Sequence, residues 1–333
     1  MHSKDIYRGT AVSLTVAVAL AVTGCSSAPV PESSSATATT ERVSIAFIGD
    51  SAPSDAIWSY AVSVMREEAE LLGVDFVDRY AGGDFSLQAQ YIEEEVARGV
   101  DAIIAPFYDP EATNDAIVSA LEAGVEVYAV LGVPNLQEDV LAEIGIAQTS
   151  WESYGEALGE IALPDLEDGD TVLWPAEQPG ASYITGAVEG FELAADAAGV
   201  DVTVTVLDAG SDSTESAQRQ LAFLLAKPDV GAIVTSGSIA IAAAFTAMTQ
   251  GGLSAGQPPL AGFITSPQAA EALKQGYMSA GVWTDFEGIS RQAVNDLVAM
   301  VTEGAPAPHH EAPVITITSD NIDEHIPASL RSN

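Results

Sequence analysis

The chain has 333 residues, a hydrophobic content of 47% and a formal net charge of −37. This length suits two domains of ordinary size, and the apolar content is sufficient for packed cores, which excludes a wholly disordered chain. The negative charge excludes a nucleic-acid partner, since such a partner requires clustered Lys and Arg. The single cysteine excludes an internal disulfide, a cysteine-based zinc centre and an iron–sulfur centre.

The N-terminal segment has the layout of an export signal. Lys4 and Arg8 precede an uncharged apolar run, residues 10–23, which is too short to span a bilayer. Residues 22–25 resemble the bacterial lipobox, which implies cleavage before Cys25 and its lipidation; an ordinary signal peptide with an incidental cysteine is the alternative. We therefore expect a lipoprotein signal peptide (1–24), a flexible Ser/Ala/Thr/Pro tether (25–41) and a globular body anchored at the extracytoplasmic face of the bacterial cell membrane.

The globular body alternates short apolar runs with helical stretches. Four helical stretches end at a glycine followed by an apolar run: Gly73, Gly99, Gly124 and Gly199. Strands are predicted near 43–48, 171–174, 232–235, 260–263 and 280–283, and helices near 55–72, 151–162, 182–198, 213–226, 237–250 and 286–302. This alternation predicts an α/β fold in which helices cover both faces of parallel sheets, arranged as two similar lobes.

Ligands of open α/β sheets bind beyond the carboxyl ends of the strands, so these positions contain the candidate binding residues. The candidates are Asp50, Ser51, Trp58, Tyr108, Asp109, Trp151, Ser236, Thr265, Trp283, Thr284 and Asp285. Two alternatives remain open for members of this set. Any of the tryptophans can be a core residue, and Asp109 and Asp285 can be helix caps.

Four segments of the globular body resemble the type I periplasmic binding proteins, the ribose-binding-like family that serves ABC importers. They are residues 99–104, 123–127, 186–191 and 260–263, within a similarity that extends from about Val43 to Ile317. The resemblance implies two Rossmann-like lobes joined by three chain crossings and closing on a small ligand. By this likeness the N-terminal lobe is 42–130 plus 265–283, the C-terminal lobe is 131–264 plus 284–318, and 319–333 is a C-terminal tail.

The residues that hold sugars in this family are mostly replaced here. The sugar-binding members usually have Asp-Arg where this chain has Leu131-Gly132, and Arg at the position of Thr185. They also have Asn-Asp in place of Gly237-Ser238, and Asp in place of Ile264. A sugar needs such groups for its many hydroxyls, so these replacements weaken the carbohydrate interpretation, which stays open.

A closer likeness is to the trimethylamine N-oxide-sensing periplasmic binding protein subfamily. The shared features are Trp58, Ala81-Gly82-Gly83, Trp151 and the segment 238–243, whereas Ile57 and Ile264 stand where the sensor has tyrosines. This resemblance implies a small methylated-amine or N-oxide ligand held by aromatic side chains. Indole faces attract a diffuse positive charge, and Asp109 or Asp285 would add Coulomb attraction.

An enzymatic function receives little support from the sequence. Gly49-Asp50-Ser51 resembles the nucleophile segment of SGNH esterases, but Asp323-Glu324-His325 is one residue short of the Asp-x-x-His pair that would activate Ser51. No phosphate loop, dinucleotide-binding glycine pattern or histidine metal motif is present, so neither a cofactor nor a metal is expected. We predict a solute-binding protein that is not an enzyme and whose partner is an ABC permease or, alternatively, a sensor histidine kinase.

Overall fold

The computed structural model describes residues 42–331. The expected signal peptide, the tether and Cys25 therefore lie outside the described residues. Within this part of the chain, no helix is both long and apolar enough to cross a membrane.

The first lobe is built on a six-stranded parallel sheet, as the apolar runs predict. Its strands lie in the order β11-β5-β4-β3-β1-β2. Their bounds are β1 (Ser44–Gly49), β2 (Asp75–Tyr80), β3 (Ala102–Ala105), β4 (Glu126–Val130), β5 (Gly145–Gln148) and β11 (His309–Glu311). The helices of this lobe are α1 (Ala56–Leu72), α2 (Phe85–Arg98), α3 (Pro110–Glu122), α4 (Glu138–Leu141) and α10 (Phe286–Glu303).

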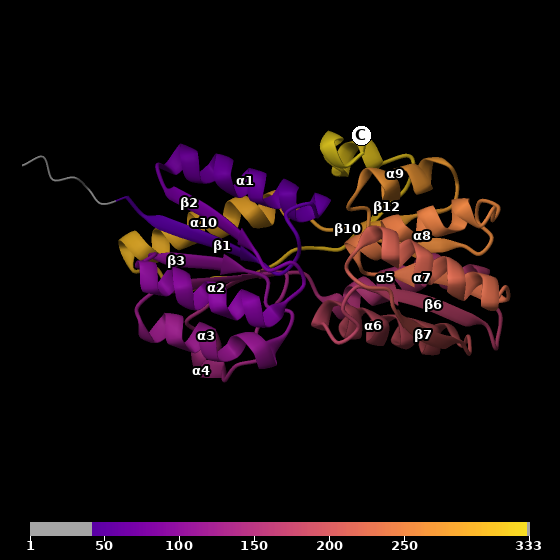
Figure 1. The fold of residues 1–333 in the computed structure, drawn as a ribbon, viewed down its shortest axis with the longest axis horizontal. Coiled ribbons are helices and arrows are strands. Elements are labelled where there is room, and N and C mark those ends of the chain that lie inside the picture. Colours follow the sequence, from indigo (N-terminus) through magenta and orange to yellow (C-terminus); the bar gives the residue numbers. More distant parts are fainter. Residues whose placement is uncertain (1–41, 332–333) are drawn as a thin grey trace, which may run out of the picture. The chain divides into compact units, whose positions relative to one another are not determined.

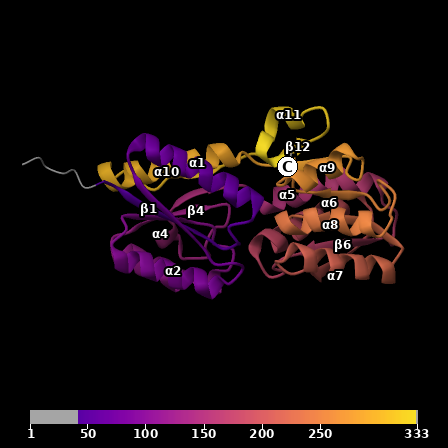
Figure 2. The same cartoon turned by 45° about the horizontal axis from the view of Figure 1, so that its top comes forward.

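Both faces of the first sheet are covered by helices (Figure 1). Side chains alternate across a strand, so Ile45 and Phe47 of β1 join the core cluster that contains residues of α1 and α10. Ala46 and Ile48 point the other way, into the cluster that contains residues of α2 and α3. Figure 2 shows α10, from the C-terminal part of the chain, lying alongside α1.

The second lobe contains a four-stranded parallel sheet in the order β7-β6-β8-β9, and β10 pairs with β12 in antiparallel fashion beside it. Its strands are β6 (Thr171–Ala176), β7 (Thr203–Asp208), β8 (Val230–Thr235), β9 (Leu260–Gly262), β10 (Gly281–Trp283) and β12 (Ile315–Ile317). Its helices are α5 (Trp151–Ala162), α6 (Ser182–Ala198), α7 (Ser213–Ala226), α8 (Ser238–Gln250), α9 (Pro267–Lys274) and α11 (Ile322–His325), with 3₁₀ turns at Leu163–Asp165 and Ala328–Leu330.

The helix ends predicted at glycines are confirmed. Gly73, Gly99, Gly124 and Gly199 all adopt the left-handed conformation, with φ of 71°, 80°, 80° and 71°. Each glycine ends a helix, and the next strand begins within a few residues.

The predicted segment boundaries of the two lobes are wrong. Strand β5 pairs with β4, so the first lobe continues to about residue 148 instead of ending at 130. Residues 265–283, expected in the N-terminal lobe, contribute α9 and β10 to the second lobe, where Phe263 and Val282 form a bridge. Most of 284–318, expected in the C-terminal lobe, forms α10 and β11 of the first. The three crossings therefore fall at 149–150, 284–285 and 312–314.

The end of the chain is not a detached polar tail. Ile322, Ile326 and Leu330 recur every four residues, and all three are buried in the main core cluster. The turn at Ala328–Leu330 contacts α1 and α9. This apolar spacing therefore attaches the predicted tail region to both lobes.

Candidate functional site

A cavity between the two lobes contains the carboxyl ends of strands from both sheets. The space between the atoms here is about 670 Å³, part of which is open solvent. The first lobe contributes the residues after β1, β2, β3 and β4 and the starts of α1 and α10, and the second lobe contributes the residues after β6, β7, β8 and β9 and the starts of α5, α6 and α8. The lining residues used below are Asp50, Ser51, Asp55, Ile57, Trp58, Tyr108, Leu131, Trp151, Glu177, Gln178, Tyr183, Ser236, Ser238, Ile239, Phe263 and Phe286.

Three carboxylates from three different segments line this cavity and are buried. Asp50, Asp55 and Glu177 are only 4%, 7% and 8% exposed. Among the lining residues that the structure describes, none is Lys, Arg or His. Burying a carboxylate without a positive partner costs free energy. Three buried acids in one cavity therefore need an explanation other than packing.

Asp55 caps helix α1 and also reaches the other lobe. Its Oδ1 accepts hydrogen bonds from the backbone N–H groups of Ile57 (3.0 Å) and Trp58 (3.4 Å). Its Oδ2 accepts one from the hydroxyl of Ser238 at the start of α8 (2.8 Å). Burial raises the pKa of Asp55, and these three hydrogen bonds oppose that rise. The Asp55–Ser238 bond joins the two lobes across the cavity.

Glu177 is held at the N-terminus of α8. Its Oε1 accepts hydrogen bonds from the backbone N–H groups of Ile239 (2.6 Å) and Ala240 (2.8 Å), where the helix dipole favours a negative charge. Its Oε2 accepts one from the Tyr183 hydroxyl (3.3 Å). A Cβ added at Gly237 would overlap this carboxylate, so only a glycine at this position leaves room for the Glu177 side chain. Burial nevertheless raises the pKa of Glu177.

Asp50 is the least satisfied of the three acids. Its Oδ1 is buried and has no hydrogen-bond partner, and the hydroxyl of the adjacent Ser51 has none either. Burial raises the pKa of Asp50 to about 7, with a further contribution from the negative charge of Asp55 and a smaller one from Glu177. Hydrogen bonds from the backbone at Asp50 and Ser51 offset only part of this rise.

Aromatic rings line the cavity together with the acids. Tyr108 lies in edge contact with Tyr183, at 4.9 Å between ring centroids, and Trp151 lies 5.9 Å from Tyr183. The Trp151 indole donates its N–H to the carbonyl oxygen of Leu131 (2.9 Å), which fixes the ring across the crossing at 149–150. The electron-rich faces of such rings attract cations.

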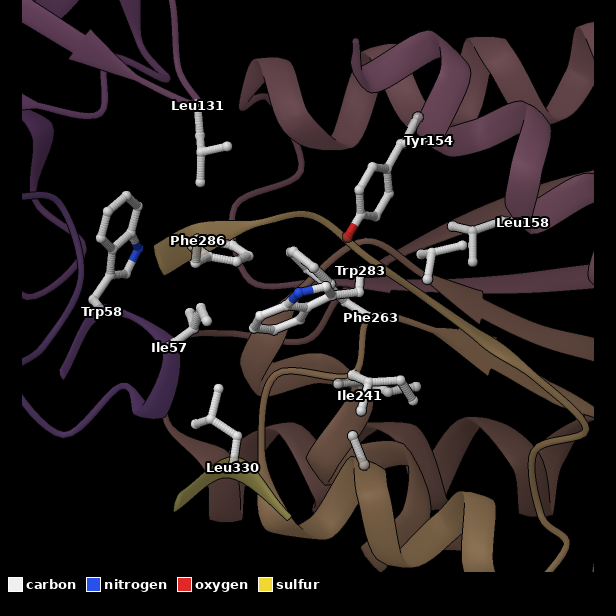
Figure 3. Close-up of a cluster of buried hydrophobic side chains, with 14 of the residues drawn as sticks. Ile57, Trp58, Leu131, Tyr154, Leu158, Ile241, Phe263, Trp283, Phe286 and Leu330 are labelled. Carbon is white, nitrogen blue, oxygen red and sulfur yellow. The ribbon is translucent and has the colours of Figure 1, made fainter. Parts of the chain in front are cut away.

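A more apolar part of the cavity adjoins this ring cluster. Figure 3 shows Ile57 and Trp58 on one side of Phe286, with Phe263 on the other. Phe263 and Phe286 are 5.5 Å apart between centroids, and Tyr154 packs edge-on against Phe263 at 4.9 Å. The cavity thus combines a buried acidic region with an aromatic and aliphatic wall.

Comparison with known protein families agrees with this two-lobed arrangement. The periplasmic binding protein domain matches residues 45–305, which is most of the chain. The chain belongs to the periplasmic binding protein family. Membership of this family implies an extracytoplasmic location.

Solved structures of periplasmic binding proteins share the fold. The myo-inositol binding protein of Caulobacter, bound to myo-inositol, is 20% identical, with a TM-score of 0.76 over 85% of this chain and 96% of that one. An ABC transporter solute-binding protein from Agrobacterium vitis with bound D-fucose is 19% identical, with a TM-score of 0.76 over 87% and 99%. A third, from Mycobacterium smegmatis with bound glycerol, is 16% identical, with a TM-score of 0.75 over 88% and 99%. No curated protein has a matching sequence.

Six of the predicted site residues line the cavity of this periplasmic binding protein: Asp50, Ser51, Trp58, Tyr108, Trp151 and Ser236. They follow β1, β3 and β8 or begin α1 and α5, as the strand-end rule predicts. The rule works here because strands of both sheets direct their carboxyl ends toward the same space. Whether these residues bind the ligand stays a prediction.

The other five predicted residues lie outside the cavity lining. Asp109 and Asp285 cap α3 and α10, accepting from the backbone N–H groups of Ala112 (3.2 Å) and Gly288 (2.9 Å), which agrees with the capping alternative. Thr284 donates to the Pro313 carbonyl (3.3 Å), so it ties two crossing segments together. Trp283 packs against Phe263 and Phe286, behind the lining, and Thr265 is fully buried.

The sequence interpretation missed several lining residues, most importantly Asp55 and Glu177. Asp55 was read only as the start of a helix, although the same side chain both caps α1 and lines the cavity. Glu177 was missed because strand β6 was expected to end at Trp174 before Pro175. The strand continues to Ala176, and Trp174 is a fully buried core residue beside Phe191.

The cavity offers Ser51 no esterase partner. Among the described lining residues there is no histidine to accept a proton from its hydroxyl. Asp323 pairs with Arg331 instead of orienting His325. Within residues 42–331, no three His, Cys, Asp or Glu side chains are grouped closely enough to hold a metal ion.

Proposed function

We propose that this protein is the lipid-anchored binding component of an ABC importer and that it captures a small organic cation, such as a methylated amine, between its lobes. The observation that carries the proposal is the presence of three buried carboxylates in a cavity whose described lining has no basic side chain. The protein would bind and deliver this ligand without transforming it.

A bound cation supplies what the cavity lacks. Its positive charge offsets the mutual repulsion of Asp50, Asp55 and Glu177 and part of the cost of their burial. The faces of Trp58, Trp151 and Tyr108 add about 0.5–2 kcal/mol for each ring in good contact with the cation. The same rings present apolar surface to methyl groups.

A carbohydrate is the second candidate, and the ligands named for similar structures favour it: myo-inositol, D-fucose and glycerol. Hydroxyls could donate to the free oxygens of the acids, and aromatic rings could stack on a sugar ring. A neutral polyol, however, brings no positive charge to offset the repulsion among these acids. The described lining also contains no Arg or Asn, and Gln178 is its one side-chain amide.

We also propose that the membrane partner of the closed, ligand-bound protein is an ABC permease. Lipidation at Cys25 would hold the protein near its permease and raise the effective concentration there, which favours import. The likeness to the trimethylamine N-oxide-sensing subfamily supports the alternative of a sensor histidine kinase as partner.

Thermal unfolding of the purified protein tests the ligand class. One panel contains trimethylammonium, choline, betaine, carnitine and trimethylamine N-oxide, and the other contains pentoses, hexoses and myo-inositol. A ligand at one hundred times its Kd adds about 2.7 kcal/mol to the free energy of unfolding, which is a shift of several degrees. We expect stabilisation by at least one cation and its loss in Trp58→Ala.

The control variant is Phe245→Ala, since Phe245 packs on Tyr277 in the second lobe and does not line the cavity. Each variant is compared with its own unfolding temperature in the absence of ligand. Stabilisation by sugars alone would refute the cation proposal and support the carbohydrate alternative.

A further inference from the structure

The three acids of the cavity differ in how many hydrogen bonds they already accept. Asp55 accepts three, from Ile57, Trp58 and Ser238. Glu177 also accepts three, from Ile239, Ala240 and Tyr183. By contrast, Asp50 Oδ1 accepts none, although it is buried within the lining. Among the carboxylate oxygens of the three acids, Asp50 Oδ1 is the one that is buried and has no donor, so a ligand donor would satisfy it.

A buried carboxylate oxygen without a donor is costly, and only an N–H or O–H group removes that cost fully. A quaternary nitrogen brings charge but no donor, whereas a protonated amine brings both. We infer that Asp50 accepts an N–H from the ammonium group of the ligand, so that the site selects protonated amines over fully methylated ones. This inference rests on the proposed function and narrows its ligand class.

The position of Asp50 suits this task. It directly follows β1, and the hydroxyl of the neighbouring Ser51 is also buried and unpartnered, so a second polar group of the ligand has a partner beside it. Trp58, Phe263 and Phe286 line the same cavity and offer an apolar surface for the methyl or alkyl groups of the amine. A ligand with a charged N–H donor and an apolar body would therefore satisfy both the acidic and the apolar parts of the cavity.

The groups that face Asp50 determine how binding depends on pH. These are the acids Asp55 and Glu177 and the hydroxyls of Tyr108 and Tyr183. The two tyrosines remain neutral because burial, reinforced by the nearby acids, raises their pKa well above the usual value. The two acids repel a charge on Asp50, so without ligand its pKa is about 7.

An ammonium must therefore displace a proton from Asp50 when it binds below that pKa. With the pKa at about 7, the affinity for the amine is roughly tenfold weaker at pH 6 than at pH 8. A ligand that needs a protonated Asp50 as donor, such as an N-oxide, shows the opposite trend. The direction of the pH dependence thus reports the role of Asp50 without any substitution.

Isothermal titration of the purified protein tests the inference with matched pairs of probes. The pairs are trimethylammonium with tetramethylammonium and dimethylethanolammonium with choline, and myo-inositol is the neutral probe. In each pair that binds, we expect the N–H member to bind about tenfold or more tightly, since one charge-assisted hydrogen bond distinguishes the two. Asp50→Asn should remove this preference, while Asp285→Asn, a helix cap outside the cavity, should keep it.

The outcomes separate this inference from the proposed function. If quaternary probes bind as tightly as their N–H partners, or if affinity falls as the pH rises, the role of Asp50 is refuted while the cation proposal stands. If only myo-inositol binds, or if no cation binds, both are refuted. Thermal unfolding of Asp50→Asn without ligand establishes that the variant is folded, and the pH profile of the wild type tests the inference independently of it.

Discussion

At the scale of single residues, the cavity places function in conflict with stability. Asp50 has a pKa of about 7 in the folded protein against an ordinary value of 3.8, because the fold buries it beside other acids. A raised carboxyl pKa means that the folded state favours the protonated form. The stability that this proton provides is complete below the unfolded-state pKa and is lost as the pH rises through the folded-state value.

Asp50→Asn should therefore stabilise the empty protein at high pH. The amide keeps the shape of the side chain and carries no charge, so the advantage of the variant over the wild type should grow by about 3 kcal/mol between pH 5 and pH 8. Chemical denaturation at the two pH values, without ligand, measures this difference. An advantage that does not change with pH would show that Asp50 does not titrate in this range.

Several single residues of the site were predictable, and others were not. Asp50 and Tyr108 directly follow apolar strands, so the strand-end rule finds them. The rule did not find Glu177, because a proline such as Pro175 usually marks the end of a strand. In this structure Pro175 lies within β6, past Leu173, which is the last residue of β6 that pairs with β8. Phe263 and Phe286 resemble ordinary core residues in the sequence, and only the approach of the two lobes makes them part of the lining.

At the scale of elements, the helices were predicted best. The bounds of α5, α6 and α7 agree with the expected ones. In each segment the apolar residues recur at helical spacing, and the ends of the segment are clear. Strand β5 was missed, since Gly145–Gln148 is only four residues long and contains one β-branched residue. Without this strand, the first crossing was expected too early, at 130–131. The second crossing was also expected too early, at 264–265 instead of 284–285, and this error assigned α9, β10 and α10 to the wrong lobes.

The contact between α5 and α6 depends on glycines. A Cβ added at Gly190 would overlap the carbonyl of Glu152, and one added at Gly155 would overlap that of Ala187. Gly190→Ala should therefore separate the two helices and destabilise the protein by about 1–3 kcal/mol or more. Because α5 begins with Trp151, ligand affinity should fall as well.

Gly180→Ala is the matched control, since no atom lies within 4 Å of the added Cβ. Its midpoint in chemical denaturation should remain close to that of the wild type. Equal midpoints for Gly190→Ala and the wild type would show that the two helices can separate without cost.

At the scale of the whole molecule, polar contacts join the two lobes at residues that line the cavity or lie next to them. Ser238 donates to Asp55 (2.8 Å), and the backbone N–H of Ser182 donates to the carbonyl of Tyr108 (3.3 Å). These bonds hold the lobes together, while repulsion among Asp50, Asp55 and Glu177 opposes closure. A cation in the cavity would turn that repulsion into attraction, so the ligand itself would favour the closed form.

A crystal structure of the protein with trimethylammonium tests the central claim most directly. The account predicts the amine inside the cavity, with its nitrogen at hydrogen-bonding distance, about 3 Å, from Asp50 Oδ1 and its methyl groups against the aromatic wall. An empty cavity at saturating amine, or a cavity that takes up myo-inositol in preference to the amine, would contradict it.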